Sequence, residues 1–358
     1  MRKLKLAFIF VGVTLTALSV LSAEKSMGFP TLKVVGRFAV PGKAGGVLVD
    51  ARWAGKNSIY LADLRDGVSE VRLAEGLPQI RRVTPPAAVM GMPLIENVAI
   101  SDKWIVVAHE GKIAWKPVGG GEWQVTKGMG ICHGLDIRGD DIVMLGFPDG
   151  ETYERSRGGM VWQANLAKGL DALHGWKVLH ESEEVAGDIN RMRQDAALGS
   201  IRFVPQGGVA VAPNFLPGVL SFSDSGSFKQ RWGSEDLWGG EVRAKAEGPE
   251  EKGWQEGSFG KDELRRFLAS RRTIDAILPL PEGPAIVVRE SKGDEARYRL
   301  GVLGPKVRWY DIPVGNLSAM ARLRGDADKN GRIVLVGVER GPTAPVSQSE
   351  ILVLELPR

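Results

Sequence analysis

Short apolar segments, each bounded by Gly, Pro, Asp or Asn, recur along the whole chain. Within many of them apolar and polar residues alternate, which is the pattern of a half-buried β-strand and not of a helix. The segments fall into groups of four, spaced like the blades of about 40–45 residues found in some repeat proteins. The sequence therefore predicts a series of small antiparallel sheets packed against one another.

The first groups are complete, and residues 58–63 followed by 67–73 give the clearest pattern. The predicted strands of the first group cover residues 46–50, 58–63, 67–73 and 79–83, and those of the second cover 97–101, 103–108, 111–115 and 122–126. The third group covers residues 134–137, 141–145, 159–164 and 176–179, and the fourth covers 200–204, 208–212, 218–222 and 228–232. The fifth group covers residues 274–278, 285–288, 297–302 and 307–310.

The last group supplies only three strands at the C-terminal end, over residues 318–322, 332–336 and 350–355. Residues 33–40, which precede the first group, read as the missing fourth strand. Pairing them with residues 350–355 would close a ring and remove open sheet edges. We therefore predict an all-β fold, a six-bladed β-propeller of four-stranded antiparallel blades that the N-terminal strand closes.

This pattern resembles the exported six-bladed propellers of the NHL-repeat, TolB-like and gluconolactonase-like families. The resemblance covers nearly all of residues 24–358 and implies a single propeller domain. Because the blade pattern specifies a fold and not an activity, the resemblance implies no reaction.

Residues 1–23 have the composition of a secretory signal peptide. Arg2, Lys3 and Lys5 are followed by an uncharged run over residues 6–23, and Ser22 and Ala23 precede Glu24. The small Ser22-Ala23 pair favours cleavage, while the run is also long enough for an uncleaved membrane anchor. We expect the protein to lie outside the cytoplasm, in a periplasm or secreted, with membrane attachment only through an uncleaved N-terminal segment.

Charge and cysteine content exclude several classes of function. The formal charge is +4, and three of the positive charges belong to residues 1–23, which leaves +1 for the rest. Nucleic-acid binding normally needs a strongly basic face, so no nucleic-acid partner is expected. Cys132 is the only cysteine, which excludes an internal disulfide and a metal site made of several cysteines.

Two long segments interrupt the strand pattern, residues 183–198 and residues 234–271. The second contains residues 261–272, whose Leu264, Phe267 and Leu268 have helical spacing and predict a short amphipathic helix. Both segments join the last strand of one blade to the first strand of the next. In a meandering blade such connections share a rim with the loops between second and third strands, so we expect both insertions on one face.

Polar residues at the strand ends on that face are the candidate ligand-binding rim. Converging polar groups at a channel mouth are the usual ligand site of such a scaffold, although they also satisfy loop backbone and one another. The candidates are Asp63, Asn97, His109, Glu110, Asn214, Arg289, Glu290 and Glu339.

The segment Cys132-His-Gly-Leu-Asp136 is similar to a strand start of paraoxonase-like lactonases. That resemblance implies that His133 is a general base beside a calcium site. A second histidine should follow closely, yet the next is His174. The alternative is a histidine that only hydrogen-bonds within the fold.

Asp326, Asp328 and Asn330 carry side-chain oxygens at alternate positions before Gly331, as in the first half of a calcium loop. The bidentate Glu that ends such a loop is replaced by Gly337. The run also falls where blade six needs a hairpin, and Asp, Asn and Gly are ordinary turn residues. Both the calcium site and the plain turn remain open.

The leading hypothesis is an extracytoplasmic binding or interaction module that uses the insertion-bearing rim to hold a protein, a peptide or a glycan. The alternative is a metal-dependent lactonase or arylesterase with His133 as base and calcium as its cofactor. A third is a scaffold in an envelope assembly.

Overall fold

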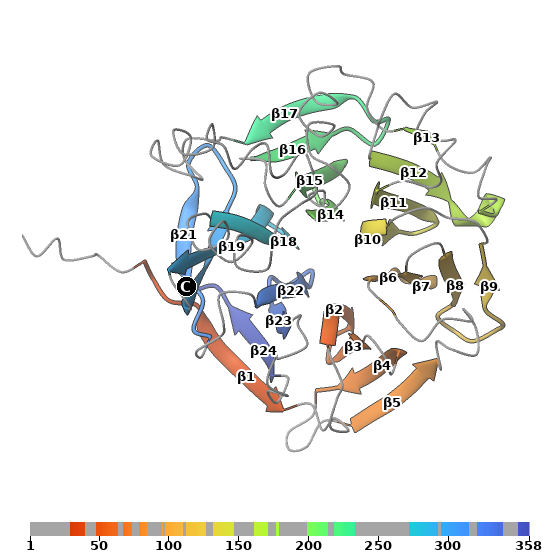
Figure 1. Cartoon of the computed structure of the whole chain (residues 1–358), viewed down its shortest axis with the longest axis horizontal. Helices are drawn as coiled ribbons and strands as arrows, with labels where there is room; N and C mark the ends of the chain where they lie inside the picture. The colour runs from red at the N-terminus through yellow and green to blue at the C-terminus, as the bar shows by residue number, and fades with distance from the viewer. Residues whose placement is uncertain are drawn as a thin grey trace, which may run out of the picture.

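Six four-stranded antiparallel sheets form a ring in the computed structural model (Figure 1), and the centre of the ring, onto which the innermost strands face, is named here the channel. The structure describes residues 29–39, 48–63, 67–73, 79–84, 95, 97–109, 112–126, 132–146, 161–170, 177–178, 199–213, 218–232, 272–292, 295–314, 321–338 and 350–357. This is the predicted six-bladed β-propeller. Residues 1–23, 183–198 and 234–271, including the predicted helix up to residue 271, lie outside the described residues.

Each blade is numbered in chain order and its strands run from the channel outward. Blade one comprises β2 (Leu48–Gly55), β3 (Ser58–Asp63), β4 (Gly67–Arg72) and β5 (Gln79–Thr84); blade two β6 (Asn97–Ile100), β7 (Trp104–His109), β8 (Lys112–Pro117) and β9 (Gln124–Val125); blade three β10 (Cys132–Arg138), β11 (Asp141–Gly146), β12 (Val161–Asn165) and β13 (Lys177–Val178).

The second half of the ring follows the same order. Blade four comprises β14 (Gly199–Phe203), β15 (Val209–Pro213), β16 (Val219–Phe222) and β17 (Phe228–Trp232); blade five β18 (Arg272–Leu280), β19 (Gly283–Lys292), β20 (Glu295–Val302) and β21 (Arg308–Asp311); blade six β22 (Arg322–Ala327), β23 (Ile333–Val338), β24 (Glu350–Glu355) and, outermost, β1 (Lys33–Ala39).

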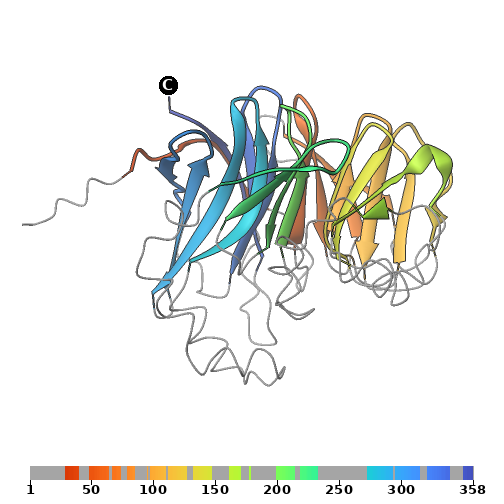
Figure 2. The same ribbon diagram turned by 90° about the horizontal axis from the view of Figure 1, so that it is seen from above.

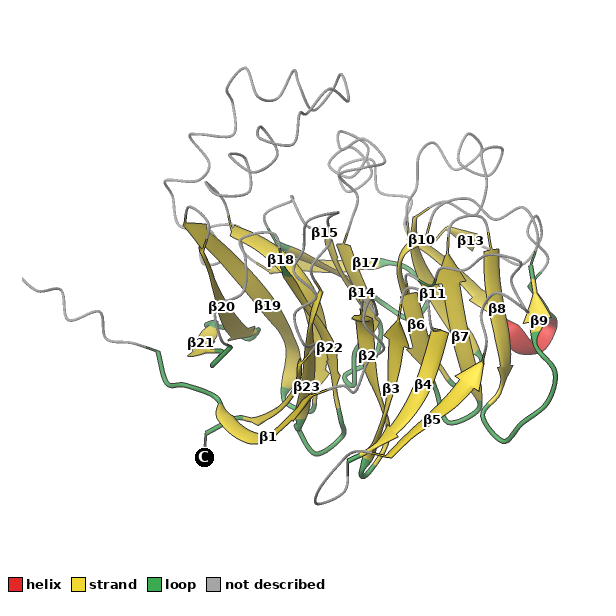
Figure 3. Cartoon of the chain, turned by 60° about the horizontal axis from the view of Figure 1, so that its bottom comes forward, coloured by secondary structure: helices red, strands yellow, loops and turns green. Residues whose placement is uncertain are grey.

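Strand direction gives the ring two different rims. Antiparallel pairing puts the start of every innermost strand on one side, named here the entry rim, and the hairpins between first and second strands on the other, named the hairpin rim (Figure 2). Among the described residues the helical structure is a 3₁₀ turn, Leu166–Lys168 (Figure 3). No helix in the described ranges is long and apolar enough to cross a membrane.

The apolar core lies between blades. Each of six clusters joins two neighbouring blades, and one of them packs Val334 and Val336 of blade six against Leu61 and Val71 of blade one. Burial of apolar surface stabilises a fold by about 25 cal/mol per Å², and this burial at every seam holds the blades together. The ring therefore has no separate central core, and its channel face is left to polar side chains.

The N-terminal strand belongs to the last blade. β1 pairs antiparallel with β24, from Lys33 opposite Glu355 to Ala39 opposite Glu350, as the sequence predicts. Just before it, Thr31 forms a parallel bridge with Asp311 of β21, and Leu32 is buried in the cluster between blades five and six. The first described residues thus lie across two blades.

Two innermost strands differ from their predicted bounds. β2 continues past Asp50 to Gly55. β22 begins at Arg322, which is the last residue of the strand predicted over residues 318–322. Asp326 is therefore inside a strand and not in the hairpin. Both errors have one cause: charged residues alternate along these strands because that face lines the channel and not an apolar core.

Candidate functional site

Buried and part-buried charged side chains line the channel on five of the six innermost strands. They occupy alternate positions, which puts them on one face of each strand. The residues concerned are Asp50 and Arg52 on β2, Asp136 on β10, Arg202 on β14, Asp275 on β18, and Arg324 and Asp326 on β22. Charges in such a place need partners, because an isolated buried charge costs several kcal/mol.

Among the described residues, side chains on the innermost strands tie neighbouring blades together through the backbone at five of the six seams. Asp136 accepts a hydrogen bond from Phe203 N at 2.8 Å, and Asp326 accepts one from Trp53 N at 3.1 Å. The same link is repeated at three further seams, where Asn97 Nδ2 donates to Cys132 O (3.0 Å), Ser200 Oγ accepts from Ile277 N (2.9 Å) and Asp275 Oδ2 accepts from Leu323 N (3.1 Å). These links fix the registry of neighbouring blades at the channel.

Two guanidinium groups bridge blades that are not neighbours. Arg52 of blade one donates to Leu135 O of blade three at 3.1 Å and pairs with Asp50 at 3.0 Å and Asp136 at 3.7 Å. Arg202 of blade four also donates to Leu135 O, at 3.4 Å, and donates to Gly325 O of blade six at 2.9 Å. The arginines therefore span the channel and connect its opposite sides.

Burial dominates the electrostatics of this layer. Burial, and after it the nearby Arg52, lower the pKa of Arg202 to about 10, so the group stays protonated at neutral pH. Burial raises the pKa of Asp326 above the ordinary carboxyl value, against the opposing effect of Arg52 and Arg202. The layer is a set of mutually compensating charges.

Blade five has its own buried pair next to the entry rim. Arg289 is 1% exposed, lies 3.5 Å from Asp275, and donates to Thr273 Oγ1 at 3.1 Å and to Ala321 O at 3.0 Å. Tyr298 OH donates to the same Ala321 O at 2.9 Å. Arg289 therefore holds the residue that precedes β22.

Most of the predicted rim residues that the structure describes have structural partners. Asp63 ends β3 as predicted and has an interaction partner. Arg289 and Glu290 lie inside β19 and not at its end, because that strand continues to Lys292. Glu290 accepts from Arg299 at 2.9 Å. His109 ends β7, and its side chain lies outside the description.

Glu110, Asn214 and Glu339 lie outside the described residues. The structure brings Asn97 and His133 to one place, since Asn97 bonds the carbonyl of the residue before His133. It does not gather the other described candidates around them. The rim assignment as a whole stays a prediction.

His133 lies at the entry-rim end of β10, where it is the extra residue of a β-bulge between Cys132 and Gly134. The bulge aims its part-buried side chain differently from a regular strand residue. A Cβ on Gly134 would come within 3.3 Å of Ile201, so blades three and four approach closely here. The lactonase interpretation stays a prediction, which ester and lactone assays of His133→Ala would test.

The predicted calcium run is divided by the fold. Asp326 faces the channel, while Asp328 begins the hairpin, where its Oδ1 accepts from the backbone of Asn330 at 2.9 Å and of Arg332 at 2.8 Å. Its Oδ2 accepts from Arg332 Nε at 2.8 Å. This geometry fits the turn interpretation. Among the described residues no three His, Cys, Asp or Glu side chains gather to hold a metal ion, and calcium stays a prediction.

Sequence reasoning missed Arg52, Asp136 and Arg202, the centre of the channel layer. The signal was present as charged residues at alternate positions in otherwise apolar strands, in the pairs Asp50/Arg52, Ser200/Arg202 and Arg324/Asp326.

Comparison with known proteins reveals the fold alone. No protein-family model matches the chain, and no curated protein matches its sequence. A member of the DUF4221 family from Bacteroides vulgatus is similar over 92% of this chain and 98% of its own, with a TM-score of 0.52 and 8% identity.

U3-55K is similar over 91% of this chain and 100% of its own (TM-score 0.50, 12% identity). YCF48 bound to D1 peptide is similar over 92% and 98% (TM-score 0.47, 11% identity). At such identities the likeness extends to the β-propeller architecture and no further.

Proposed function

We propose that the protein is an exported binding module that holds a protein or peptide on its entry rim. The observation that carries the proposal is the position of four strand ends. The chain leaves β13 at Val178 and returns at Gly199, then leaves β17 at Trp232 and returns at Arg272. All four ends lie on the entry rim, so each long segment starts at the outer edge of that rim and finishes beside the channel mouth.

The channel layer supports the proposal from below. Binding sites work best on elements whose own side chains are fixed by packing and hydrogen bonds. Arg52 and Arg202 fix the innermost strands across the ring, and Arg289 holds the residue before β22 of the neighbouring blade. The entry rim thus stands on a rigid base, while the segments that join its strands are free to vary in length and composition.

The composition of residues 1–23 supports export. The mass and the cellular fraction of the protein test it: recovery outside the cytoplasm is expected, either free after loss of residues 1–23 or bound to the membrane with those residues retained, and a full-length chain confined to the cytoplasm would contradict it.

The rim is tested by replacing residues 183–198 and 234–271, separately and together, with short Gly-Ser linkers. Photo-crosslinking in the envelope of the producing cell should give protein adducts that disappear in the linker variants, while the melting temperature stays that of a folded ring. Arg138→Ala, on the hairpin rim, is the matched control and should keep the adducts. Adducts that survive both replacements would refute an entry-rim site, and adducts to carbohydrate in place of protein would assign the rim to a glycan.

A further inference from the structure

The first described residues leave the propeller from its outer wall and not from a rim. Leu32 N donates to Asp311 O and Asp311 N donates to Pro30 O, both at 3.0 Å. Arg299 lies 4.7 Å from the centre of the Phe29 ring, and Leu32 is 2% exposed. Because Asp311 belongs to the outermost strand of blade five, the position of Phe29 is fixed on the wall (Figure 1).

The wall made by β1, β21 and residues 29–32 is named here the five–six wall. Five residues, 24–28, separate it from the uncharged run over residues 6–23. An extended chain advances at most about 3.6 Å per residue, so this connection reaches about 20 Å. A run inserted in a bilayer would therefore hold the five–six wall close to the membrane surface, whatever the rest of the ring does.

The side chains of this wall suit such a position. Val34 and Val35 are 36% and 42% exposed and lie next to each other, which is unusual for a strand and follows from the bulge before Gly36. Lys33 beside them is exposed, and β21 adds the part-buried Tyr310, which packs on the core between blades five and six, while Trp309 packs against the core between blades four and five. Apolar side chains with Tyr and Lys nearby are typical of surfaces that meet the headgroup region.

Charge alone would not bring the wall to a membrane. Arg37 pairs with Glu350, Arg297 with Asp311, and Arg308 with Glu282, so the wall is close to neutral apart from Lys33. With a short tether, strong charge attraction is not needed. The tether raises the effective concentration of the wall at the membrane into the millimolar range, and weak contacts form at such a concentration.

We propose that the five–six wall faces the membrane while residues 6–23 are inserted in it, so that the ring stands edge-on to the bilayer. The inference rests on the proposed export and deepens the proposed function. In this orientation the channel axis lies parallel to the membrane, and the entry rim faces neighbouring molecules in the same compartment.

The test uses the full chain in vesicles of phosphatidylethanolamine and phosphatidylglycerol. Single cysteines replace Val35, Ile80 or Val118 in a Cys132→Ser background and carry an environment-sensitive fluorophore. The three positions are matched, since the side chains are 42%, 41% and 37% exposed, but Ile80 and Val118 lie on blades one and two. A second pair, Lys306→Cys on blade five and Lys229→Cys on blade four, guards against a variant that misfolds.

Emission from position 35 should shift to shorter wavelength and be quenched by headgroup spin-labelled lipid, as should position 306. Positions 80, 118 and 229 should keep the emission of a label in water. Equal quenching at all positions, or stronger quenching at 80 or 118, would overturn the edge-on orientation. Neither result depends on a ligand at the entry rim, so the linker experiment tests the proposed function separately.

Discussion

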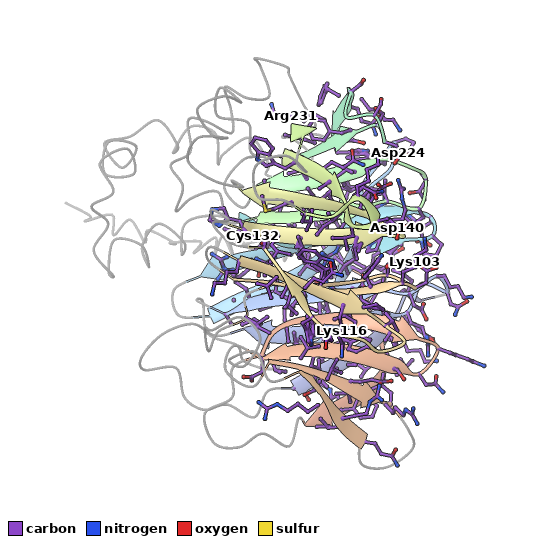
Figure 4. The ribbon with its side chains drawn as sticks, turned by 90° about the vertical axis from the view of Figure 1, so that its right-hand side faces the viewer. Lys103, Lys116, Cys132, Asp140, Asp224 and Arg231 are labelled. Carbon is purple, nitrogen blue, oxygen red and sulfur yellow. The ribbon has the colours of Figure 1, made fainter. Side chains whose placement is uncertain are left out.

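The channel and the hairpin rim both contain ion pairs, but in opposite environments. In the channel, the side chains of Arg289 and Asp275 are 1% and 0% exposed. On the hairpin rim, those of Arg138 and Asp224 are 43% and 58% exposed, and Figure 4 shows Asp224, Lys103 and Asp140 on the side of the ring away from Cys132. The same chemistry should therefore be indispensable at one place and dispensable at the other.

Removing a buried charge should have the largest effect. Arg289→Met leaves Asp275 without its cation and Ala321 O without one of its donors, which should lower the free energy of unfolding by about 3–5 kcal/mol. Chemical denaturation measures it. The double variant Asp275→Asn/Arg289→Met should recover part of the loss. If Arg289→Met costs no more than a rim substitution, burial does not distinguish the two regions.

Backbone packing gives a second comparison of the same regions. A Cβ on Gly325, in β22, would meet Val334 O at 1.9 Å, whereas a Cβ on Gly119, in the turn after β8, would meet nothing within 4 Å. Gly325→Ala should cost about 1–3 kcal/mol of stability. Gly119→Ala should change it by less than about 0.5 kcal/mol. Similar melting temperatures for the two variants would show that β22 can shift away from β23.

The exposed ion pair between Arg138 and Asp224 should contribute little to the stability of the fold, and only at a pH above the acidic range. Its hydrogen bond with Arg138 lowers the pKa of Asp224 from the ordinary 3.8, so the pair stabilises the fold above that value and the contribution is lost as the pH falls through the lowered pKa. Solvent screens the pair, so its coupling at neutral pH should stay below about 1 kcal/mol. A double-mutant cycle with Arg138→Ala and Asp224→Asn, run at neutral and at acidic pH, measures it. Coupling of several kcal/mol would contradict the contrast between the regions.

Metal removal should have no effect at the blade-six hairpin. Both carboxylate oxygens of Asp328 already accept hydrogen bonds from their own turn. Dialysis against EDTA should leave the melting temperature unchanged. A rise on adding calcium that Asn330→Ala abolishes would instead support the calcium loop.

The sequence predicts the ring well and the channel poorly, for one physical reason. Apolar periodicity reports burial against neighbouring blades, and it placed strands such as 58–63 and the pairing of residues 33–40 with 350–355 correctly. The channel face is buried but charged, so the predicted strand stopped too early in β2, at Asp50, and was placed too early for β22, over residues 318–322. The sequence Arg324-Gly-Asp326 has the composition of a turn and is held as strand by contacts from other blades.

The candidate site was less predictable, because its partners are distant in sequence. Arg52 and Leu135 are 83 positions apart, and Arg202 and Gly325 are 123 apart. A pattern of residue types can predict that His133 or Asn97 lies at the channel mouth. It does not reveal that the Asn97 side chain donates a hydrogen bond to a backbone carbonyl.

The strand that completes blade six has a consequence for how the molecule is made. Arg37 and its partner Glu350 are separated by 313 positions, so the last blade has no outermost strand until nearly the whole chain has emerged. Contacts of such long range carry a large loop-closure entropy and slow the search for the native state. Synthesis must therefore be nearly complete before the ring can close, because residues 33–39 pair with residues 350–355.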